Sequence, residues 1–227
     1  MILPGIRAVF FDAVGTLLFP AEPVSRTYAE AARRHGSVLP ERVIRERFRA
    51  AWARQERLDQ LAGWRTDEDR EKARWRAIVA EVIADAPTDV CFPELWAHFS
   101  RPDAWVVNPD AADLLAELTT RGLILGIASN FDARLIGLLD GLPELAAVRD
   151  RCVVSSAVGW RKPAGRFFAA LAAAAGCDPR AVLHVGDDWG NDFEGATAAG
   201  LRAVLYDPDH RSPVGPHIRR LRDLLAG

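Results

Sequence analysis

The chain is poor in cysteine, has no long apolar run and carries almost no net charge. Its three cysteines, Cys91, Cys152 and Cys177, are odd in number and far apart. This pattern fits neither a disulfide framework nor a zinc site, and it predicts reduced, buried thiols. No stretch approaches 18 apolar residues, and the first residues show no basic segment followed by an apolar one. We therefore expect a cytoplasmic protein without an export signal or a membrane span.

A formal net charge of −2 provides no long-range attraction to nucleic acid or to an anionic membrane, so we expect neither as a partner. Apolar residues make up 49% of the chain and charged residues 26%, which is typical of a soluble globular protein. Its 227 residues suffice for one large domain or for a core with a small insert. Both a monomer and a homodimer remain open.

Lysine is also scarce. Lys72 and Lys162 are the only lysines among 29 basic residues, so arginine accounts for the other 27. A lysine kept at position 162, within Gly-Trp-Arg-Lys-Pro, indicates a need for a compact ammonium group rather than a planar guanidinium. Chance is the alternative explanation.

The sequence pattern predicts an α/β core interrupted by a helical segment. Residues 6–11 form an apolar run typical of a buried strand. Residues 20–99 follow a helical period instead, with Ile44, Phe48 and Trp52 four residues apart. We expect residues 1–19 and 100–227 to form the catalytic core and residues 20–99 to form a helical cap domain.

Beyond the helical segment, strands alternate with helices, which predicts a parallel sheet covered by helices on both faces. A first helix is expected from Asn108 to about Arg121, and a last one at about Val214–Leu225. Between them we expect strands at 123–128, 152–155, 181–185 and 202–206, and helices at 132–140, 163–175 and 191–199.

Tryptophan is concentrated near the helical segment, where five of the seven lie between positions 52 and 105. Packing between helices would explain this clustering. An aromatic wall that shapes a substrate pocket is the alternative, and the sequence alone does not decide between them.

Polar groups follow the predicted strands in a definite order. Asp12 ends the first apolar run, and a Gly-Thr turn comes soon after it. Downstream, Ser129-Asn130, Lys162-Pro163 and the segment 186–192 each follow or adjoin an apolar run. Open α/β sheets bind ligands at the carboxyl ends of their strands. Acid, small polar group, lysine and acid pair, in that order, predict a site that handles phosphate.

The residue types indicate how such a site would work. Asp12 can attack a phosphate only if the negative charge of its target is neutralised, and Mg²⁺ with oxygen ligands would do so. Asp187 and Asp192 follow the strand predicted at 181–185. If that strand lies beside the first one, Asp187 faces Asp12 and a Mg²⁺ site results.

Three further residues are candidates for binding the phosphate. The Ser129 hydroxyl and the Asn130 amide can each hold a phosphate oxygen, and Lys162 would balance the remaining charge.

These motifs resemble the haloacid dehalogenase-like (HAD) hydrolase superfamily, subfamily I. Its pattern is Asp-x-Asp-Gly-Thr, then Ser or Thr, then Lys, then Gly-Asp-x-x-x-(Asn)-Asp. The counterparts here are Asp12–Thr16, Ser129, Lys162 and Gly186–Asp192. Residues 127–132 and 159–163 are most similar to the branch called haloacid dehalogenase-like hydrolase domain-containing protein 3.

The resemblance implies an α/β fold, with a Rossmann-like parallel core of five strands in the order 5-4-1-2-3 and a helical cap inserted after the first strand. It implies a Mg²⁺-dependent phosphatase acting on a small phosphorylated metabolite through an aspartyl-phosphate.

Matched position by position, the family pattern assigns a role to each site residue. Asp12 would be the nucleophile, and Ser129 and Lys162 would hold the phosphoryl group. The metal ligands would be Asp12, the main-chain carbonyl of Val14, Asp187, and Asp192 directly or through water.

Val14 departs from the family pattern, which usually has a second aspartate there to protonate the leaving group and activate water. Valine does neither, and that catalytic contribution is commonly about 10²–10⁴-fold. The resemblance then implies a good leaving group, such as an acyl or aryl phosphate, or an acid supplied by the cap. His35, Glu22 and Tyr28 are the conceivable cap donors.

Other functions remain open at this stage. A 2-haloacid dehalogenase also lacks the second aspartate, but its last motif differs from Gly186-Asp187. A C–P bond hydrolase needs a cap lysine, and Lys72 is the only one. A metal- and phosphate-binding regulatory protein with little turnover is the third alternative.

Overall fold

The computed structural model describes residues 4–209 and 215–225 of the chain. Its centre is a sheet in which all the paired strands run parallel, in the order β5-β4-β1-β6-β7-β8. The strands are β1 (Ala8–Phe11), β4 (Ile124–Ser129), β5 (Cys152–Val154), β6 (Val182–Gly186), β7 (Arg202–Tyr206) and β8 (His217–Ile218).

The predicted fold class is confirmed, but the predicted count of five strands is wrong because β8 adds a sixth at the edge. The five other strands lie in the expected order when they are numbered along the chain. The helix expected at 214–225 is also wrong. β8 and a 3₁₀ helix (Leu221–Leu225) take its place, and Val214 lies outside the described residues. The edge of β7 explains this, because Leu205 N donates to Pro216 O (3.0 Å) and Asp207 N to Ile218 O (2.8 Å).

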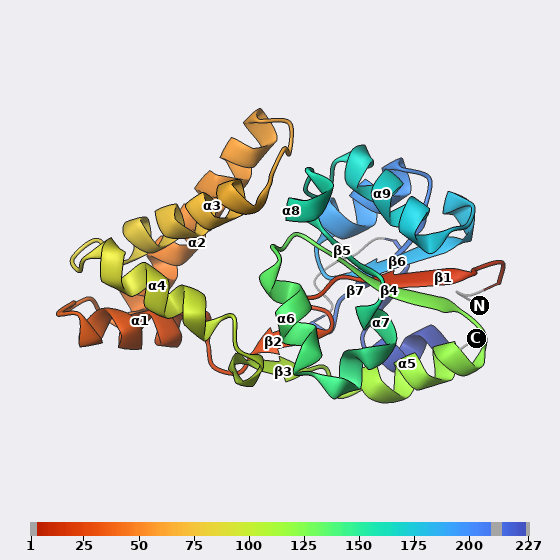
Figure 1. The fold of residues 1–227 in the computed structure, drawn as a ribbon, viewed down its shortest axis with the longest axis horizontal. Helices are drawn as coiled ribbons and strands as arrows, with labels where there is room; N and C mark the ends of the chain where they lie inside the picture. The colour runs from red at the N-terminus through yellow and green to blue at the C-terminus, as the bar shows by residue number, and fades with distance from the viewer. Residues whose placement is uncertain (1–3, 210–214, 226–227) are drawn as a thin grey trace.

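Helices cover both faces of the sheet (Figure 1). In β1, Val9 and Phe11 belong to the apolar cluster that includes residues of α5 (Ala111–Thr120), α6 (Arg134–Asp140) and α7 (Ala146–Arg149). Ala8 and Phe10 belong to the cluster on the other face, with residues of α9 (Gly165–Ala175) and α10 (Gly195–Ala198). Successive side chains of a strand point to opposite faces, so this short run is buried on both sides.

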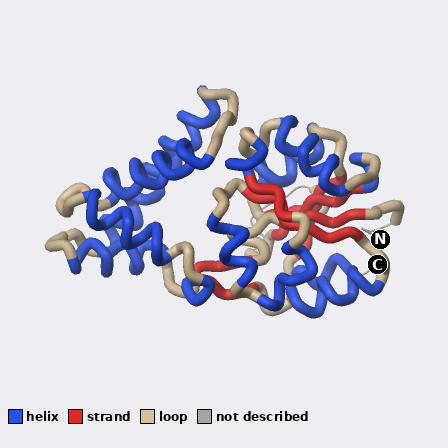
Figure 2. Tube along the Cα trace, viewed as in Figure 1, coloured by secondary structure: helices blue, strands red, loops and turns tan. Residues whose placement is uncertain are grey.

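Four helices follow the first strands and pack around an apolar cluster of their own, set to one side of the sheet (Figure 2). They are α1 (Val24–Arg34), α2 (Glu41–Leu61), α3 (Glu68–Val82) and α4 (Thr88–His98). A short antiparallel pair absent from the predictions, β2 (Leu18–Pro20) and β3 (Trp105–Val107), flanks them. Within residues 4–209 and 215–225, no helix is long and apolar enough to cross a membrane.

The loop between α2 and α3 attaches this helical segment to the core. Arg161 N donates to Trp64 O (2.8 Å), and Thr66 N donates to Gly159 O (3.2 Å). Arg65 forms an isolated bridge with Trp160. The tip of the helical segment is therefore bonded to the core loop that carries Lys162.

Candidate active site

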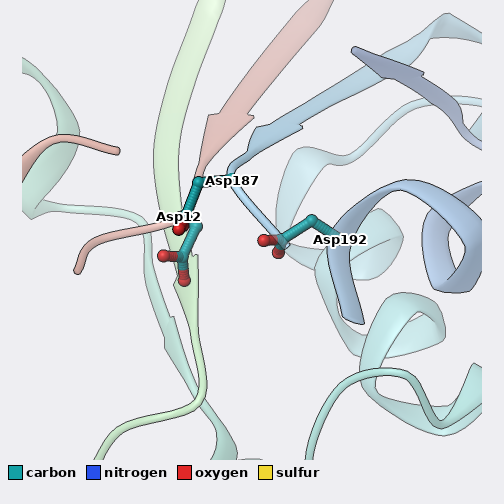
Figure 3. A group of neighbouring side chains, drawn as sticks. All are labelled: Asp12, Asp187 and Asp192. Carbon is teal, nitrogen blue, oxygen red and sulfur yellow. The ribbon is translucent and has the colours of Figure 1, made fainter. Parts of the chain in front are cut away.

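Two neighbouring strands of the sheet end in aspartates. Asp12 follows β1 and Asp187 follows β6, and the register places Phe11 opposite Val185. The pairing extends past the strands, since Asp12 N donates to Val185 O over 2.8 Å. Asp187 therefore lies beside Asp12, the arrangement that the sequence predicts for adjacent strands (Figure 3).

Asp192 completes a cluster of three carboxylates. It lies in a π-helical turn (Trp189–Glu194) and points its carboxylate toward the other two (Figure 3). One oxygen from each aspartate lies within 4.8 Å of the others. Carboxylate oxygens this close are typical ligands of Mg²⁺, although acidic groups also meet without a metal.

Lys162 links two of these aspartates. Its Nζ donates to Asp12 Oδ1 (2.7 Å), to Asp192 Oδ1 (2.5 Å) and to the main-chain oxygen of Ala128 (3.0 Å). Only 2% of the side chain is exposed. Burial alone would lower the pKa of Lys162, but the two aspartates outweigh it and raise that pKa above its ordinary value, so the group stays an ammonium.

The carboxylates differ in their proton affinity. Burial, together with the charge of Asp192, raises the pKa of Asp12 despite the contact with Lys162. Asp187 keeps an accessible edge, but partial desolvation and the charges of Asp12 and Asp192 raise its pKa to about 7. Burial acts against the charge of Asp192 too, yet Lys162 and His184 lower the pKa of Asp192 below its ordinary value.

The cluster holds more acidic groups than basic ones. Three aspartates face one ammonium group, and their oxygens are the hard donors that a divalent cation prefers. A nearby cation would reverse the raised pKa values of Asp12 and Asp187, because it favours the charged form of each carboxyl group. The donor set and the surplus of acidic groups both fit Mg²⁺.

His184 is a site residue absent from the sequence predictions. It lies in β6, fully buried, and its Nε2 is 2.8 Å from Asp192 Oδ1. An ionised carboxylate can only accept hydrogen bonds, so Nε2 of His184 carries a hydrogen and donates the hydrogen bond to Asp192. Its Nδ1 has no hydrogen-bond partner in the described part of the chain. The sequence signal for His184 is that it is the one polar side chain within the otherwise apolar strand β6.

Two glycines let the aspartates approach the backbone. A Cβ on Gly15 would lie 2.4 Å from a carboxylate oxygen of Asp187, and one on Gly186 would lie 2.2 Å from Cγ of Asp192. Gly15 also has a φ of +101°, a conformation that other residues rarely adopt. Any side chain at either position would displace a carboxylate of the cluster.

Ser129 is the last residue of β4, the strand on the other side of β1, and Asn130 follows it. The Ser129 hydroxyl is nearly buried and makes no hydrogen bond to the rest of the described chain, so it is available to a ligand. Unlike the Ser129 hydroxyl, the side-chain amide of Asn130 already has hydrogen-bond partners within the chain. Its Oδ1 accepts from Lys162 N (2.7 Å) and its Nδ2 donates to Lys162 O (3.0 Å), so it holds the main chain of Lys162 in place. Its predicted contact with phosphate remains a prediction.

The three conceivable cap acids lie in different places. His35 Nε2 is 2.7 Å from Glu94 Oε2, and Glu22 is exposed and pairs with Arg26. Tyr28 lines an apolar cavity whose wall also includes Val14. Lys72, the lysine that a C–P bond hydrolase would need, is exposed and does not line that cavity.

Comparisons with known proteins indicate the family of the chain. The model of the family described as haloacid dehalogenase-like hydrolase matches residues 6–200. Haloacid dehalogenase-like hydrolase domain-containing protein 3 from Homo sapiens is 34% identical over 216 residues, which cover 92% of this chain and 85% of that protein. Ribulose-1,5-bisphosphate 5-phosphatase from Halopiger xanaduensis is 28% identical over 210 residues, with 90% and 86% covered.

A structural comparison supports the same fold. The L-2-haloacid dehalogenase from Xanthobacter autotrophicus superposes with a TM-score of 0.75 at 22% identity, over 96% of each chain. The fold, the family model and the 34% identical relative lead to one conclusion. This chain belongs to the haloacid dehalogenase-like hydrolase family.

Proposed function

We propose that this protein is a Mg²⁺-dependent phosphatase that hydrolyses a small phosphorylated metabolite through an aspartyl-phosphate on Asp12. The observation that carries the proposal is the position of Asp12, which lies beside Asp187 and is bonded to Lys162 over 2.7 Å. The surplus of acidic groups in this cluster favours a bound divalent cation. The relative from Halopiger xanaduensis, whose name is that of a phosphatase, supports the reaction class.

The residues differ in how directly they would hold the metal. Asp12, Asp187 and the main-chain carbonyl of Val14 are the proposed direct ligands. Asp192 already accepts from Lys162, from His184 and from Asp188 N (3.0 Å), so we assign it a contact through water. Bound Mg²⁺ would neutralise charge on the phosphate oxygens.

The chemistry then falls to the chain's own groups. Oδ1 of Asp12 accepts from Lys162, and a carboxylate oxygen of Asp12 attacks phosphorus. The bond from phosphorus to the leaving oxygen breaks, and that oxygen keeps the electron pair. Water then attacks the phosphorus of the aspartyl-phosphate, which releases inorganic phosphate and restores Asp12. Lys162 and the Ser129 hydroxyl would hold the phosphoryl oxygens during both steps.

Val14 limits which substrates can react. Its side chain has no proton to give, so the leaving oxygen departs as an anion unless water protonates it. This favours substrates whose leaving group is a stable anion, and it predicts low activity toward alkyl phosphates.

The test is a panel of phosphorylated metabolites and aryl phosphates, assayed for phosphate release with Mg²⁺ and again with a chelator. Turnover should require Mg²⁺ and should vanish in Asp12→Asn, which removes the nucleophile with little change in shape. Asp89→Asn, an exposed change on α4, is the matched control and should retain activity. Activity in freshly purified Asp12→Asn equal to the parent would overturn the mechanism.

A second candidate is a 2-haloacid dehalogenase, because Val14 leaves the chain without the second aspartate, as in those enzymes, and the L-2-haloacid dehalogenase from Xanthobacter autotrophicus shares the fold. Chloride release from 2-chloropropionate in the presence of a chelator, without phosphate release from the panel, would favour it. A regulatory role with little turnover would instead show binding of Mg²⁺ and phosphate by calorimetry, without release of phosphate from the panel or of chloride from 2-chloropropionate.

A further inference from the structure

A large cavity beside the aspartate cluster is lined mainly by apolar side chains. Its volume is about 450 Å³, and 17 residues from both the helical segment and the core form its wall. Val14 and Asn130 belong to that wall. Because Val14 follows Asp12 by two positions and Asn130 follows Ser129 directly, the cavity lies next to the proposed reaction site.

Aromatic rings make up most of the wall, nine of the 17 residues. In the helical segment, the centroids of Tyr28 and Phe48 are 5.3 Å apart, those of Phe48 and Trp52 6.2 Å, and those of Trp52 and Trp75 5.8 Å. Such ring contacts support one another. The wall therefore offers ring faces on which another ring can stack.

Neither of the two charged residues in the wall, Arg49 and Arg134, needs a charged ligand as its partner. Arg134 donates from Nε and Nη2 to Asp132, each over 2.7 Å, and its guanidinium lies over Trp96, 3.4 Å from the ring centroid. Its charge is thus already balanced. Arg49 is exposed, so its charge stays in water.

Tyr28 is the remaining polar group deep in the cavity. Only 1% of the residue is exposed, and its hydroxyl makes no hydrogen bond to the residues that the structure describes. Burial raises the pKa of Tyr28 above its ordinary value, so it stays a neutral phenol. One hydrogen-bonding atom of a ligand can be matched there, within surroundings that are otherwise apolar.

We infer that the substrate is an aryl phosphate monoester whose leaving group is a bulky aromatic alcohol of two or more rings. The inference rests on the proposed phosphatase function. The cavity volume of about 450 Å³ lies within the range of about 300–1,000 Å³ that is typical of small-molecule pockets. The ring-lined wall selects flat apolar groups, and preformed apolar pockets with few polar groups are typical of small-molecule sites.

The residue at position 14 leads to the same class of substrate independently. Without an acid there, the leaving oxygen departs as an anion unless water protonates it. A phenolate has a conjugate acid with a pKa of about 10, as tyrosine does, whereas that of hydroxide, the simplest model for an alkoxide, is about 15.7. Val14 therefore disfavours alkyl esters through its chemistry, while its apolar side chain contributes to the wall that holds the ring.

The experiment compares phenyl, 2-naphthyl and 4-biphenylyl phosphate with the full-length, Mg²⁺-loaded protein. Their phenols have similar acidity, so the chemical step stays nearly constant while the apolar area grows. Burial of about 55 Å² of additional apolar area corresponds to about a tenfold gain in binding. We expect kcat/KM to rise at least tenfold from the phenyl to the biphenylyl ester.

A variant that narrows the cavity makes the test specific. Val24→Trp, at the start of α1, would fill part of the volume and should lower the ratio of biphenylyl to phenyl kcat/KM at least tenfold. Leu61→Ala, an exposed change at the end of α2 that does not touch the cavity, should leave the ratio unchanged.

The possible outcomes separate this inference from the function on which it rests. Equal kcat/KM for the three esters would overturn the substrate class and leave the phosphatase proposal standing. No hydrolysis of the three esters, together with phosphate release from the metabolite panel, would also overturn the substrate class. No phosphate release from the esters or from the panel with Mg²⁺ would overturn the phosphatase proposal. In that case 4-phenylphenol is the probe. Saturable quenching of tryptophan fluorescence, weakened in Val24→Trp, would support the aromatic-ligand site, and no quenching would overturn it.

Discussion

Replacing Arg161 with methionine should destabilise the protein strongly, although the residue lies outside the aspartate cluster. Arg161 precedes Lys162 in the core, and its side chain reaches across to the helical segment. It donates to Glu71 and lies 3.5 Å from a carboxylate oxygen of Asp59. These three side chains are at most 2% exposed. A change here therefore acts on a buried ion cluster that joins the two parts of the chain.

The magnitude follows from the charge balance of that cluster. Three arginines meet three carboxylates in it, namely Arg70, Arg74, Arg161, Glu56, Asp59 and Glu71. Methionine at position 161 would leave one surplus negative charge in the interior. Removing one partner of a buried pair costs about 3–5 kcal/mol. Glu71 still accepts from the Thr66 hydroxyl (2.7 Å), so we expect the lower end, about 3 kcal/mol.

Urea unfolding measures this cost, with tryptophan fluorescence reporting on the helical segment and circular dichroism on the whole chain. The midpoint should fall while the slope stays the same, since the surface exposed on unfolding changes little. The double variant Arg161→Met/Glu71→Leu removes both charges and should recover most of the loss. Arg76→Met is the matched control, because Arg76 pairs with Asp89 at the surface and should matter little.

Two results would refute the reasoning. A loss below about 1 kcal/mol for Arg161→Met would mean that water or a shifted side chain compensates the buried carboxylates. A double variant no more stable than the single one would mean that the cost comes from lost packing of the arginine stem rather than from charge.

Three further changes test the proposed site itself. Lys162→Arg should lower kcat/KM about 100-fold, because a wider guanidinium misplaces the phosphoryl oxygens, and parity with the parent in steady-state assays would contradict this. Val14→Asp should raise kcat/KM for alkyl phosphates but barely for 4-nitrophenyl phosphate, whose leaving group needs no proton; an unchanged alkyl rate in folded, Mg²⁺-binding protein would show that the missing acid is not limiting. His184→Leu removes a donor to Asp192 and should weaken Mg²⁺ binding about 10–100-fold by calorimetry, whereas unaltered affinity would restrict His184 to packing.

Much of the core could be predicted from local patterns. Short apolar runs that end in polar residues marked β1, β4 and β6, and the strand at 202–206 matched β7 at both ends. Parallel strands present their carboxyl ends at one edge, so Asp12 and Asp187 are expected to face each other if their strands are neighbours, as the structure shows them to be. The strand order and the roles of the site residues came instead from the resemblance to a family.

Other features depend on contacts that no local pattern encodes. The pairing of β8 with β7 depends on an open sheet edge, whereas the local pattern predicts a helix at the same residues. The amide of Asn130 holds the main chain of Lys162, 32 positions away, a contact that no local pattern predicts. The clustering of tryptophans was visible in the sequence, but only the packing of four helices against the core turned several of them into the wall of a cavity.

The sequence by itself determined which groups stand at the ends of strands, because backbone propensity and apolar periodicity act over a few residues. The tertiary structure decided which of those groups meet. Lys162 bonds to Asp12 over a separation of 150 positions, and Arg161 bonds to Glu71 over 90. Such pairs form only once packing has brought distant elements together and excluded the water that would otherwise solvate each charge.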